Sequence, residues 1–451
     1  MTEHSSRREF LKTAGATGLS ALTAGMLTGC GALHRRFTKP GIELPRTHAR
    51  EQIRIGFVGL GGMGSNHIEH LLRVPGATIC AVCDIVPEKV ARIQDLVEKT
   101  GQPRPTGYSK GDRDFVRLCE TEQLDIVYNA APWEWHVPIC VAAMRNGKHA
   151  ATEVPAALTA DDCWKLVEYA EKFEKHCVML ENCNYGRFEM MVFNMVRKGV
   201  FGEIVHAEVG YQHDLRAVKF DMQGEGLWRR AHATKRDGNF YPTHGLGPAA
   251  QAMDINRGDQ FDYLVSMSGN ARGLALYAEK TLPPDSPLRS ERYKLADVNT
   301  TLIRTVRGRT IYVVHDTHLP RPYARFGLFQ GTNAIYGGHP PRVHIEGRSP
   351  GHDWEPIDKY ADEFEHPLWR TDAAQRATGG HGGMDYLENL RLIQCLQRGE
   401  PTDMNVYDAA AISCVVELTA RSVAKGSEPV SIPDFTRGRW RTNSPLAIVN
   451  G

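Results

Sequence analysis

Short apolar runs alternate with amphipathic stretches through the first part of the chain. The runs that predict buried strands lie at residues 53–58, 78–82, 124–130, 149–152 and 177–180. Apolar residues at helical spacing occur between them, as in residues 160–176. Strand and helix patterns that alternate in this way are typical of a doubly wound α/β domain with a parallel sheet. We therefore expect a Rossmann domain over residues 51–180.

The pattern changes after this point. Strand-like runs with partial alternation lie at residues 202–211, 261–267, 299–306, 310–316 and 327–336. Helical patterns return only near the end, at residues 384–398 and 407–425. Residues 181–451 are therefore predicted to form an α+β domain with an open, largely antiparallel or mixed sheet, and this domain should bind the substrate.

Composition narrows the class of protein. The 451 residues include 41% hydrophobic and 24% charged residues, and the mean hydropathy is −0.38. These values are typical of a globular protein and exclude a polytopic membrane protein. With 54 basic and 53 acidic residues, the chain lacks the basic excess that displaces counterions from nucleic acids. No nucleic-acid partner is expected.

The first thirty residues have the features of an export signal. Arg7-Arg8 precedes an apolar stretch over residues 14–27, which is too short and too rich in small residues to span a bilayer. The Arg pair favours the twin-arginine route, and Leu27-Thr28-Gly29-Cys30 is typical of a lipoprotein processing site that acylates Cys30. Residues 31–50 would form a tether. We expect a periplasmic or cell-envelope lipoprotein that contacts the membrane only through its lipid anchor.

A G-x-G-x-x-G motif over residues 59–64 lies between a predicted strand and a predicted helix. Its glycines permit a tight turn and close approach of a pyrophosphate, and the helix N-terminus supplies N–H donors. Asp84 follows the second strand, roughly 20 residues further on, where an acidic residue accepts from the ribose and disfavours a 2′-phosphate. We predict NAD as the cofactor. The residues of this motif that would hold it are Gly59, Gly61, Gly62, Met63, Gly64 and Asp84.

More loops should lie at the same edge, because the carboxyl ends of parallel strands meet in the crevice where such sheets bind ligands. The cofactor residues expected from these loops are Trp133, Glu134, Trp135, His136, Glu153, Val154 and Asn182. For the two tryptophans, packing of the domain edge is the alternative.

Cysteine and histidine patterns favour neither a disulfide framework nor a metal site. Of ten cysteines, nine remain besides Cys30, an odd number without regular spacing. Cys80 and Cys83 form C-x-x-C within an apolar strand pattern and are expected in the core. His381 and Asp385 do not complete a set of three or four ligands, so no metal is predicted. Residues 379–383 are either a loop with a substrate-facing His381 or the lead-in to a helix.

Several segments closely resemble glycoside hydrolase family 109, the NAD-dependent α-N-acetylgalactosaminidases within the Gfo/Idh/MocA oxidoreductase-like family. The resemblance covers nearly the whole chain after the export signal. The segments that carry it are Trp133-Glu134-Trp135-His136, Asn182-Cys183-Asn184-Tyr185, residues 210–216, Tyr241-Pro242-Thr243-His244-Gly245-Leu246-Gly247-Pro248 and residues 255–259.

One departure from the broader family is informative. Its dehydrogenases usually carry Glu-Lys-Pro, whose Lys assists proton movement at the substrate hydroxyl, whereas this chain has Glu153-Val154-Pro155. Since Val cannot transfer protons, this difference favours a glycosidase over a plain dehydrogenase.

The resemblance implies a redox route to glycoside cleavage, unlike the usual pair of carboxylates. NAD would oxidise the sugar C3, a base would remove the C2 proton, the C1 glycoside would leave by elimination, and hydration followed by reduction would restore both sugar and NAD. It implies terminal α-N-acetylgalactosamine on a glycan as the substrate.

Residue roles follow from the same resemblance. His244 and Tyr241 would handle the C3 hydroxyl proton, Tyr185 would act at C2 or at the leaving oxygen, and Glu153 would contact the nicotinamide side or orient catalytic groups. The residues expected to contact the sugar are Tyr211, Arg230, Tyr241, Pro242, Thr243, His244 and Tyr323.

Two alternatives stay open. One is an NAD-dependent sugar dehydrogenase of the Gfo/Idh/MocA family, and the other is a non-catalytic periplasmic sugar-binding protein. A homo-oligomer is compatible with either.

Overall fold

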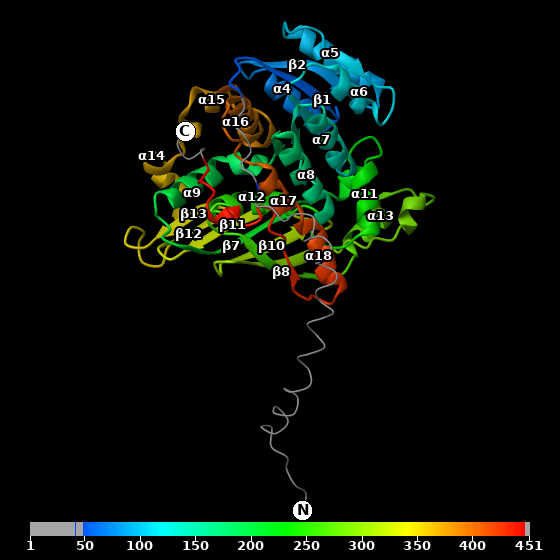
Figure 1. Cartoon of the computed structure of the whole chain (residues 1–451). Coiled ribbons are helices and arrows are strands. Elements are labelled where there is room, and N and C mark those ends of the chain that lie inside the picture. The colour runs from blue at the N-terminus through cyan, green and yellow to red at the C-terminus, as the bar shows by residue number, and fades with distance from the viewer. Residues whose placement is uncertain (1–40, 42–47, 447–451) are drawn as a thin grey trace, which may run out of the picture.

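The computed structural model describes residue 41 and residues 48–446. The predicted export signal and Cys30 lie outside the described residues. Two sheets organise the described part, and they stand one above the other in Figure 1. The predicted fold class is confirmed.

The first sheet has six parallel strands in the order β3-β2-β1-β4-β5-β6. This is the doubly wound order, in which the chain reverses direction between β1 and β4. The strands are β1 (Ile53–Val58), β2 (Ala77–Cys83), β3 (Thr106–Tyr108), β4 (Ile126–Asn129), β5 (His149–Thr152) and β6 (Cys177–Met179).

The central strands of this sheet are apolar along nearly their whole length because both faces are covered. All four residues of β4 are buried, and Phe57 of β1 stacks on Tyr128 with ring centroids 5.5 Å apart. The helices are α4 (Gly62–Leu71), α5 (Pro87–Lys99), α6 (Asp114–Thr121), α7 (His136–Arg145) and α8 (Ala160–Phe173). The short 3₁₀ turns are η1 (Trp133–Trp135) and η2 (Asn182–Tyr185).

The second sheet is mixed, with nine strands in the order β14-β13-β12-β11-β7-β10-β9-β8-β15. Among the described strands of this sheet, only β7 and β10 pair in parallel. The strands are β7 (Ile204–Gln212), β8 (Phe261–Ser268), β9 (Val298–Thr305), β10 (Thr310–Asp316), β11 (Ala324–Gly331), β12 (Ala334–Gly338), β13 (Pro341–Ile345), β14 (Glu355–Pro356) and β15 (Val430–Ser431).

Helices cover one face of the second sheet, and the other face is open to solvent in the part of the chain that the structure describes (Figure 1). Buried and more exposed residues alternate along β9, as expected for a sheet with one solvated face. The longer helices after β6 are α9 (Arg187–Arg197), α11 (Gly226–Lys235), α12 (Thr243–Ala252), α13 (Gly273–Thr281), α16 (Met384–Arg398), α17 (Val406–Ser413) and α18 (Val415–Ala424).

Two helices join the sheets. Helix α12 packs on β7 and on the turn η2 that follows β6, and α16 packs on α4 and η2. Residues that follow β6, begin α12 and begin α16 therefore meet at the carboxyl edge of the parallel sheet, where such folds bind ligands.

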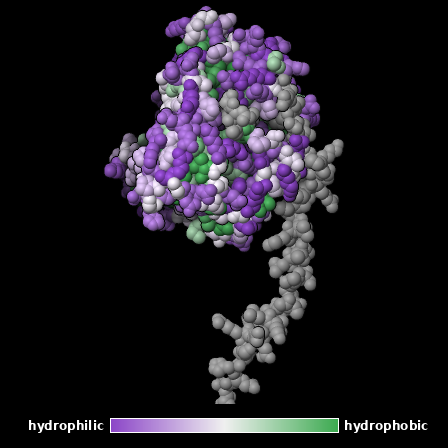
Figure 2. Space-filling model, turned by 90° about the vertical axis from the view of Figure 1, so that its left-hand side faces the viewer, coloured by the Kyte–Doolittle hydropathy of each residue, from purple (hydrophilic) through white to green (hydrophobic). Residues whose placement is uncertain are grey.

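The face of the molecule seen in Figure 2 is mainly polar. Hydrophilic residues cover most of the face in Figure 2, and its hydrophobic residues lie in separate places. Within residues 48–446, all nine cysteines are free thiols, and eight of them are buried. A search of the described helices for length and apolar character sufficient to cross a bilayer gives none.

Candidate functional site

The glycine motif turns from β1 into α4 and leaves its outer side open. Gly59 has φ +87°, and a Cβ there would lie 2.5 Å from the backbone nitrogen of Ala131. A Cβ on Gly64 would lie 1.9 Å from the carbonyl oxygen of Gly59. In the described structure, Cβ atoms on Gly61 and Gly62 would meet nothing within 4 Å. Two glycines thus close the turn and two leave room for a pyrophosphate at the helix N-terminus, so the loop fits NAD.

Asp84 holds this loop from the end of β2. Its Oδ2 accepts from the N–H of Leu60 at 2.7 Å, and its Oδ1 accepts from the N–H of Val86 at 2.9 Å. Each carboxylate oxygen has a second acceptor site, which is available to a ribose hydroxyl. Met63 lies in the first turn of α4.

The loops after β4 and β5 form one wall. Trp133 is buried and donates from Nε1 to the carbonyl oxygen of Val154 at 3.2 Å, next to the cis Val154–Pro155 bond. The ring nitrogens of His136 lie 2.8 and 2.9 Å from the carbonyl oxygens of Pro155 and Ala131. Both ring nitrogens of His136 are therefore occupied by contacts within the wall. Only the backbone of this residue is available to a cofactor.

Glu134 and Trp135 lie on the outer side of the wall. Trp135 packs edge-on against Phe115 with ring centroids 6.0 Å apart, and Glu134 is exposed, with Oε2 at 3.4 Å from Nε2 of His232. Trp135 thus packs at the edge of the domain, which is the alternative stated above for the two tryptophans. Trp133 faces the second domain.

Glu153 is paired with a histidine of the cofactor helix α4. Its Oε1 lies 2.6 Å from Nε2 of His67, and Asn389 donates to Nδ1 of that histidine at 2.9 Å. Because Nδ1 accepts, Nε2 carries the proton and donates to Glu153. Burial alone would lower the pKa of His67, but the Glu153 carboxylate outweighs it and the pKa is raised. The pair fixes Glu153 relative to the glycine loop.

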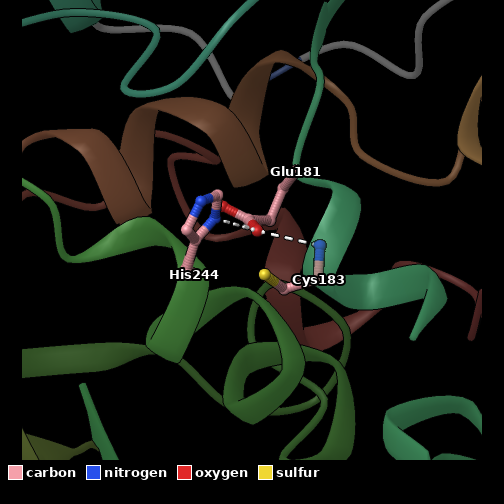
Figure 3. A group of neighbouring side chains, drawn as sticks. All are labelled: Glu181, Cys183 and His244. Carbon is pink, nitrogen blue, oxygen red and sulfur yellow. Dashed lines mark hydrogen bonds and ion pairs between the residues drawn. The ribbon is translucent and has the colours of Figure 1, made fainter. Parts of the chain in front are cut away.

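A second histidine–carboxylate pair comes from the two joining elements. Figure 3 shows His244, at the start of α12, directed toward Glu181, which follows β6. Nδ1 of His244 lies 2.7 Å from Oε1 of Glu181, which also accepts from the N–H of Cys183 at 3.1 Å. Burial would raise the pKa of Glu181, but the imidazole outweighs it and holds this pKa below its ordinary value. Nδ1 therefore donates to Glu181, which leaves Nε2 as the ring nitrogen available to a substrate.

This pair is also part of a cluster of three side chains whose types can bind a metal ion. Oxygen, sulfur and nitrogen atoms of Glu181, Cys183 and His244 lie within 4.8 Å of one another. However, the guanidinium of Arg325 lies 3.0 Å from Sγ of Cys183, and burial raises the pKa of this thiol well above its ordinary value. A neutral thiol beside a guanidinium is a poor partner for a cation. We therefore describe the group as a hydrogen-bonded pair with a neighbouring thiol.

Aromatic rings surround His244. The Tyr241 ring centroid lies 4.8 Å from that of His244 and 4.5 Å from that of Tyr211, and Trp133 lies 6.0 Å from Tyr241. Tyr323 packs edge-on against Tyr211 at 6.0 Å. Burial raises the pKa of Tyr211 to about 12 and that of Tyr241 well above its ordinary value, so both phenols act as donors. The structure brings these five predicted residues together.

Two more predicted residues set the geometry of this cluster. Pro242 is the N-cap residue of α12, and Thr243 is its first residue and is buried. The positive end of the helix dipole thus lies between Tyr241 and His244, and a helix N-terminus favours negative charge.

The arginine that joins the cluster is Arg229 and differs from the predicted one. The Arg229 guanidinium lies 5.0 Å from the ring centroid of Trp133 and 5.2 Å from that of Tyr241. The expected Arg230 instead donates to the carbonyl oxygen of Lys219 at 3.0 Å and pairs with Glu291, also at 3.0 Å. Neighbouring residues on a helix point about 100° apart, so only one of the two can face the rings.

The structure does not bring Tyr185 into the cluster. Its hydroxyl donates to Oδ2 of Asp403 at 3.1 Å, and the same oxygen accepts from Arg391 at 3.0 Å. Burial raises the pKa of Tyr185 well above its ordinary value. The hydroxyl is thus part of a buried network under α16, and the role expected for Tyr185 at C2 does not match this position.

Asn182 connects the loop after β6 to α16. Its amide donates to Oδ1 of Asp385 at 2.7 Å, and the amide of Asn66 on α4 donates to Oδ2, also at 2.7 Å. Nδ1 of His381 lies 2.9 Å from Oδ2, with half of its side chain exposed. Residues 379–383 therefore lead into α16, and they leave His381 partly open to solvent.

Sequence reasoning assigned no role to Glu181, His67 or Arg229. Glu181 carries a signal that was present in the sequence, because an acidic residue directly after a parallel strand lies at the ligand-binding edge. His67 lies within α4 and is identified only by its contact with Glu153.

Family models match the two parts of the chain. Residues 185–442 match the model of the glycosyl hydrolase 109 C-terminal domain, and residues 53–181 match that of the oxidoreductase family with an NAD-binding Rossmann fold. NAD is the cofactor of the first domain.

Relatives and solved structures agree with this division. The chain is 44% identical over 453 residues to a glycosyl hydrolase family 109 protein of Shewanella pealeana, covering 98% of this chain and 99% of that one. It is 44% identical over 447 residues to one of Solibacter usitatus, covering 98% and 100%. A levoglucosan dehydrogenase in complex with NADH and levoglucosan shares the fold, with a TM-score of 0.63 at 17% identity over 85% of this chain and 100% of that one. The chain therefore belongs to glycosyl hydrolase family 109.

Proposed function

We propose that this protein hydrolyses terminal α-N-acetylgalactosaminides by oxidation, elimination, hydration and reduction, without net consumption of NAD. The observation that carries the proposal is the His244–Glu181 pair, 2.7 Å apart, at the ligand-binding edge of an NAD-binding sheet. It supplies an oriented base beside the cofactor domain in a chain where Val154 stands at the usual Lys position.

His244 accepts the proton of the C3 hydroxyl through Nε2, while Glu181 stabilises the imidazolium that forms. Tyr241 donates a hydrogen bond to the developing negative oxygen, and the N-terminus of α12 faces the same oxygen. NAD, when bound, takes up two electrons with the C3 hydrogen and later returns them. The rings of Trp133 and Tyr211, which both pack against Tyr241, keep bulk water from the sugar face.

The proton at C2 becomes acidic once C3 is a ketone. We assign its removal to Glu153, whose side chain is 15% exposed and whose position is fixed by His67. The C1–O bond breaks as the C2–H electrons form the double bond, and the leaving oxygen takes up a proton from solvent. Water then adds to C1 and releases a proton to solvent, and C2 regains a proton from the same carboxyl group after that group has exchanged its proton with solvent.

The test uses purified protein without added nucleotide and an aryl α-N-acetylgalactosaminide deuterated at C2. We expect the aryl alcohol to be released with no accumulation of NADH, and the recovered sugar to have lost deuterium to the solvent. Cleavage with the label fully retained would overturn the mechanism.

The same assay separates the alternatives. A dehydrogenase would form one NADH per free sugar oxidised and would release no aryl alcohol. A sugar-binding protein would give neither signal.

We also propose that the protein is exported by the twin-arginine route and anchored through Cys30. This proposal rests on Arg7-Arg8 and on the sequence before Cys30. Fractionation of cells that express the intact chain and the variants Arg7→Lys with Arg8→Lys, or Cys30→Ser, tests it. The double Lys variant should stay in the cytoplasm, and Cys30→Ser should lose membrane association.

A further inference from the structure

The turn before α16 places His381 in an unusual backbone conformation. Its φ of +50° is a left-handed value that costs free energy for a residue with a side chain, and Gly379, Gly382 and Gly383 beside it have φ of +97°, +73° and +94°. A strained conformation of this kind persists only where surrounding contacts hold it, and it is common at functional sites. The turn thus fixes where the imidazole of His381 lies relative to α16.

A buried carboxylate orients this imidazole. Nδ1 of His381 lies 2.9 and 3.1 Å from the two oxygens of Asp385, and the same oxygens accept from the amides of Asn182 and Asn66. Burial would raise the pKa of Asp385, but the imidazole and the amide of Asn182 outweigh it and lower this pKa, so the carboxylate is ionised. An ionised carboxylate only accepts hydrogen bonds. Nδ1 is therefore the donor, and Nε2 is left for another partner.

Nε2 lies on the exposed side of the ring. The side chain of His381 is 51% exposed, whereas that of Asp385, which Nδ1 faces, is 0% exposed. The two groups already assigned to proton transfer are more enclosed, with 13% of the His244 side chain and 15% of the Glu153 side chain exposed. Of the three groups, His381 therefore exchanges protons with solvent most readily.

The charges around His381 favour its protonated form. The hydrogen bond to Asp385 raises the pKa of His381 above its ordinary value, although burial acts in the opposite direction. Glu153, which follows β5 of the first sheet, also raises this pKa, and Arg325 in β11 of the second sheet lowers it. The ring thus lies where residues of the two sheets meet. A protonated imidazole in such a place is a suitable general acid.

Three neighbouring groups are less suited to donate a proton. Burial raises the pKa of Tyr323 above its ordinary value, which makes the phenol a weaker acid. Burial also lowers the pKa of His70, on α4, to about 4, and it lowers the pKa of His213, which follows β7. Both of these rings are therefore neutral at neutral pH and hold no proton to give beyond the one on the neutral imidazole.

We propose that His381 is the general acid that delivers the solvent proton to the leaving glycosidic oxygen. The leaving oxygen carries the rest of the glycan, which has to extend into solvent, so this oxygen lies on the open side of the site. The N–H bond at Nε2 breaks as the new O–H bond forms, and the electron pair of the C1–O bond stays with the oxygen. The neutral imidazole then takes a proton from solvent.

Asp385 is a positioning residue in this step. It holds the imidazole through Nδ1 and stabilises the imidazolium before the proton is given up. The inference rests on the proposed function, in which His244 acts at C3, Glu153 acts at C2 and the proton of the leaving oxygen comes from solvent.

Two substrates that differ only in the leaving group test this role. A dinitrophenolate leaves without a proton, whereas an alkoxide needs one. The experiment measures kcat/KM for a dinitrophenyl and a methyl α-N-acetylgalactosaminide with the full-length protein as purified. In His381→Gln, whose amide can still donate to Asp385, kcat/KM should fall by about a hundredfold or more for the methyl glycoside and by less than about threefold for the dinitrophenyl glycoside. His352→Gln, at an exposed position, is the matched control and should change neither value.

The pH profile of the unmodified protein is a second readout. Activity on the methyl glycoside should fall as the pH rises through the pKa of His381, because Nε2 then lacks its proton, and activity on the dinitrophenyl glycoside should lack this fall. Asp385→Asn removes the carboxylate that raises the pKa of His381, so it should move the fall to lower pH. The same alkaline fall on both substrates would overturn the inference even if His381→Gln did not fold.

Deuterium at C2 separates failure of this inference from failure of the proposed function. In His381→Gln the methyl glycoside should lose its C2 deuterium to solvent while it stays intact, because oxidation at C3 and removal of the C2 proton precede the slowed step. Equal losses of kcat/KM for the two substrates, or no loss for either, in a variant that unfolds at the temperature of the unmodified protein would overturn the inference. If the unmodified protein cleaves neither glycoside and exchanges no deuterium, the proposed function fails and this inference falls with it.

Discussion

Nδ1 of His244 and Oε1 of Glu181 lie 2.7 Å apart although 63 positions of the chain separate them. Glu181 follows the last strand of the parallel sheet, and His244 lies in the first turn of the helix that packs on the second sheet. The pair therefore forms only when α12 is packed against the turn that follows β6, so its geometry depends on how the two sheets are joined.

Glu181→Gln tests the role of this pair. The amide can donate to Nδ1, which moves the imidazole proton to Nε2 and removes the base that faces the substrate. We expect kcat for an aryl α-N-acetylgalactosaminide to fall by about a hundredfold or more, with little change in KM. His244→Ala should abolish turnover while the nucleotide stays bound, and the exposed His352→Ala is its matched control. Loss of nucleotide from His244→Ala would contradict the assignment.

Arg229 and Arg230 make a second test, because they are adjacent and chemically identical. Arg229→Met removes the guanidinium that lies over Trp133 and Tyr241, so KM should rise about tenfold or more. Arg230→Met removes the contacts to the backbone of Lys219 and to Glu291, so it should lower the melting temperature more than it changes KM. Michaelis parameters and thermal unfolding on both variants decide between them. The reverse pattern would restore Arg230 as the sugar contact.

The two kinds of glycine in the cofactor loop should respond differently to alanine. In Gly61→Ala the new Cβ meets nothing within 4 Å in the described structure, so stability should be kept, but the methyl group occupies the space that a pyrophosphate needs. In Gly64→Ala the Cβ would lie 1.9 Å from the carbonyl oxygen of Gly59, which should destabilise the domain by about 1–3 kcal/mol or more. Nucleotide released on denaturation, measured by mass spectrometry, and thermal unfolding distinguish the two effects. Full nucleotide content in Gly61→Ala would count against the placement of the pyrophosphate.

Much of the fold was predictable because its signals are local. The apolar runs of β1 and β4 and the alternation in β9 follow directly from which faces are covered. The sequence pattern did not predict where a short break divides one expected element into two. Residues 327–336 were expected as one strand, but β11 ends at Gly331 and β12 begins at Ala334. Residues 407–425 were expected as one helix, but α17 and α18 meet at Cys414.

The site was predictable only where its residues follow strands or form a dense motif. His244 and Tyr241 lie in such a motif, and Glu153 follows β5. The choice between Arg229 and Arg230 depends on how α11 is rotated against the first domain, which no local pattern in the sequence specifies. The direction of the Tyr185 hydroxyl depends on Asp403, a residue more than two hundred positions away. Contacts of this kind form only in the folded tertiary structure.

A buried histidine pair in the first domain should make stability sensitive to mild acid. The rings of His149 and His176 lie 5.0 Å apart, and burial lowers their pKa to about 3 and about 4 respectively. Because the unfolded chain titrates near 6.5 and the native state does not, the unfolded state binds more protons between about pH 6.5 and pH 4, and stability falls as the pH is lowered through this window.

His176→Leu should weaken this acid sensitivity. Both ring nitrogens of His176 are buried without a hydrogen-bond partner in the described structure, so a leucine of similar size removes the protonation penalty without breaking a bond. At pH 5 the penalty from one such histidine is at most about 2 kcal/mol. Melting temperatures measured at pH 7 and pH 5 should therefore differ less for His176→Leu than for the unmodified protein, whereas the exposed His352→Leu should keep the original difference. An equal loss of melting temperature in all three proteins would show that other groups set the acid response.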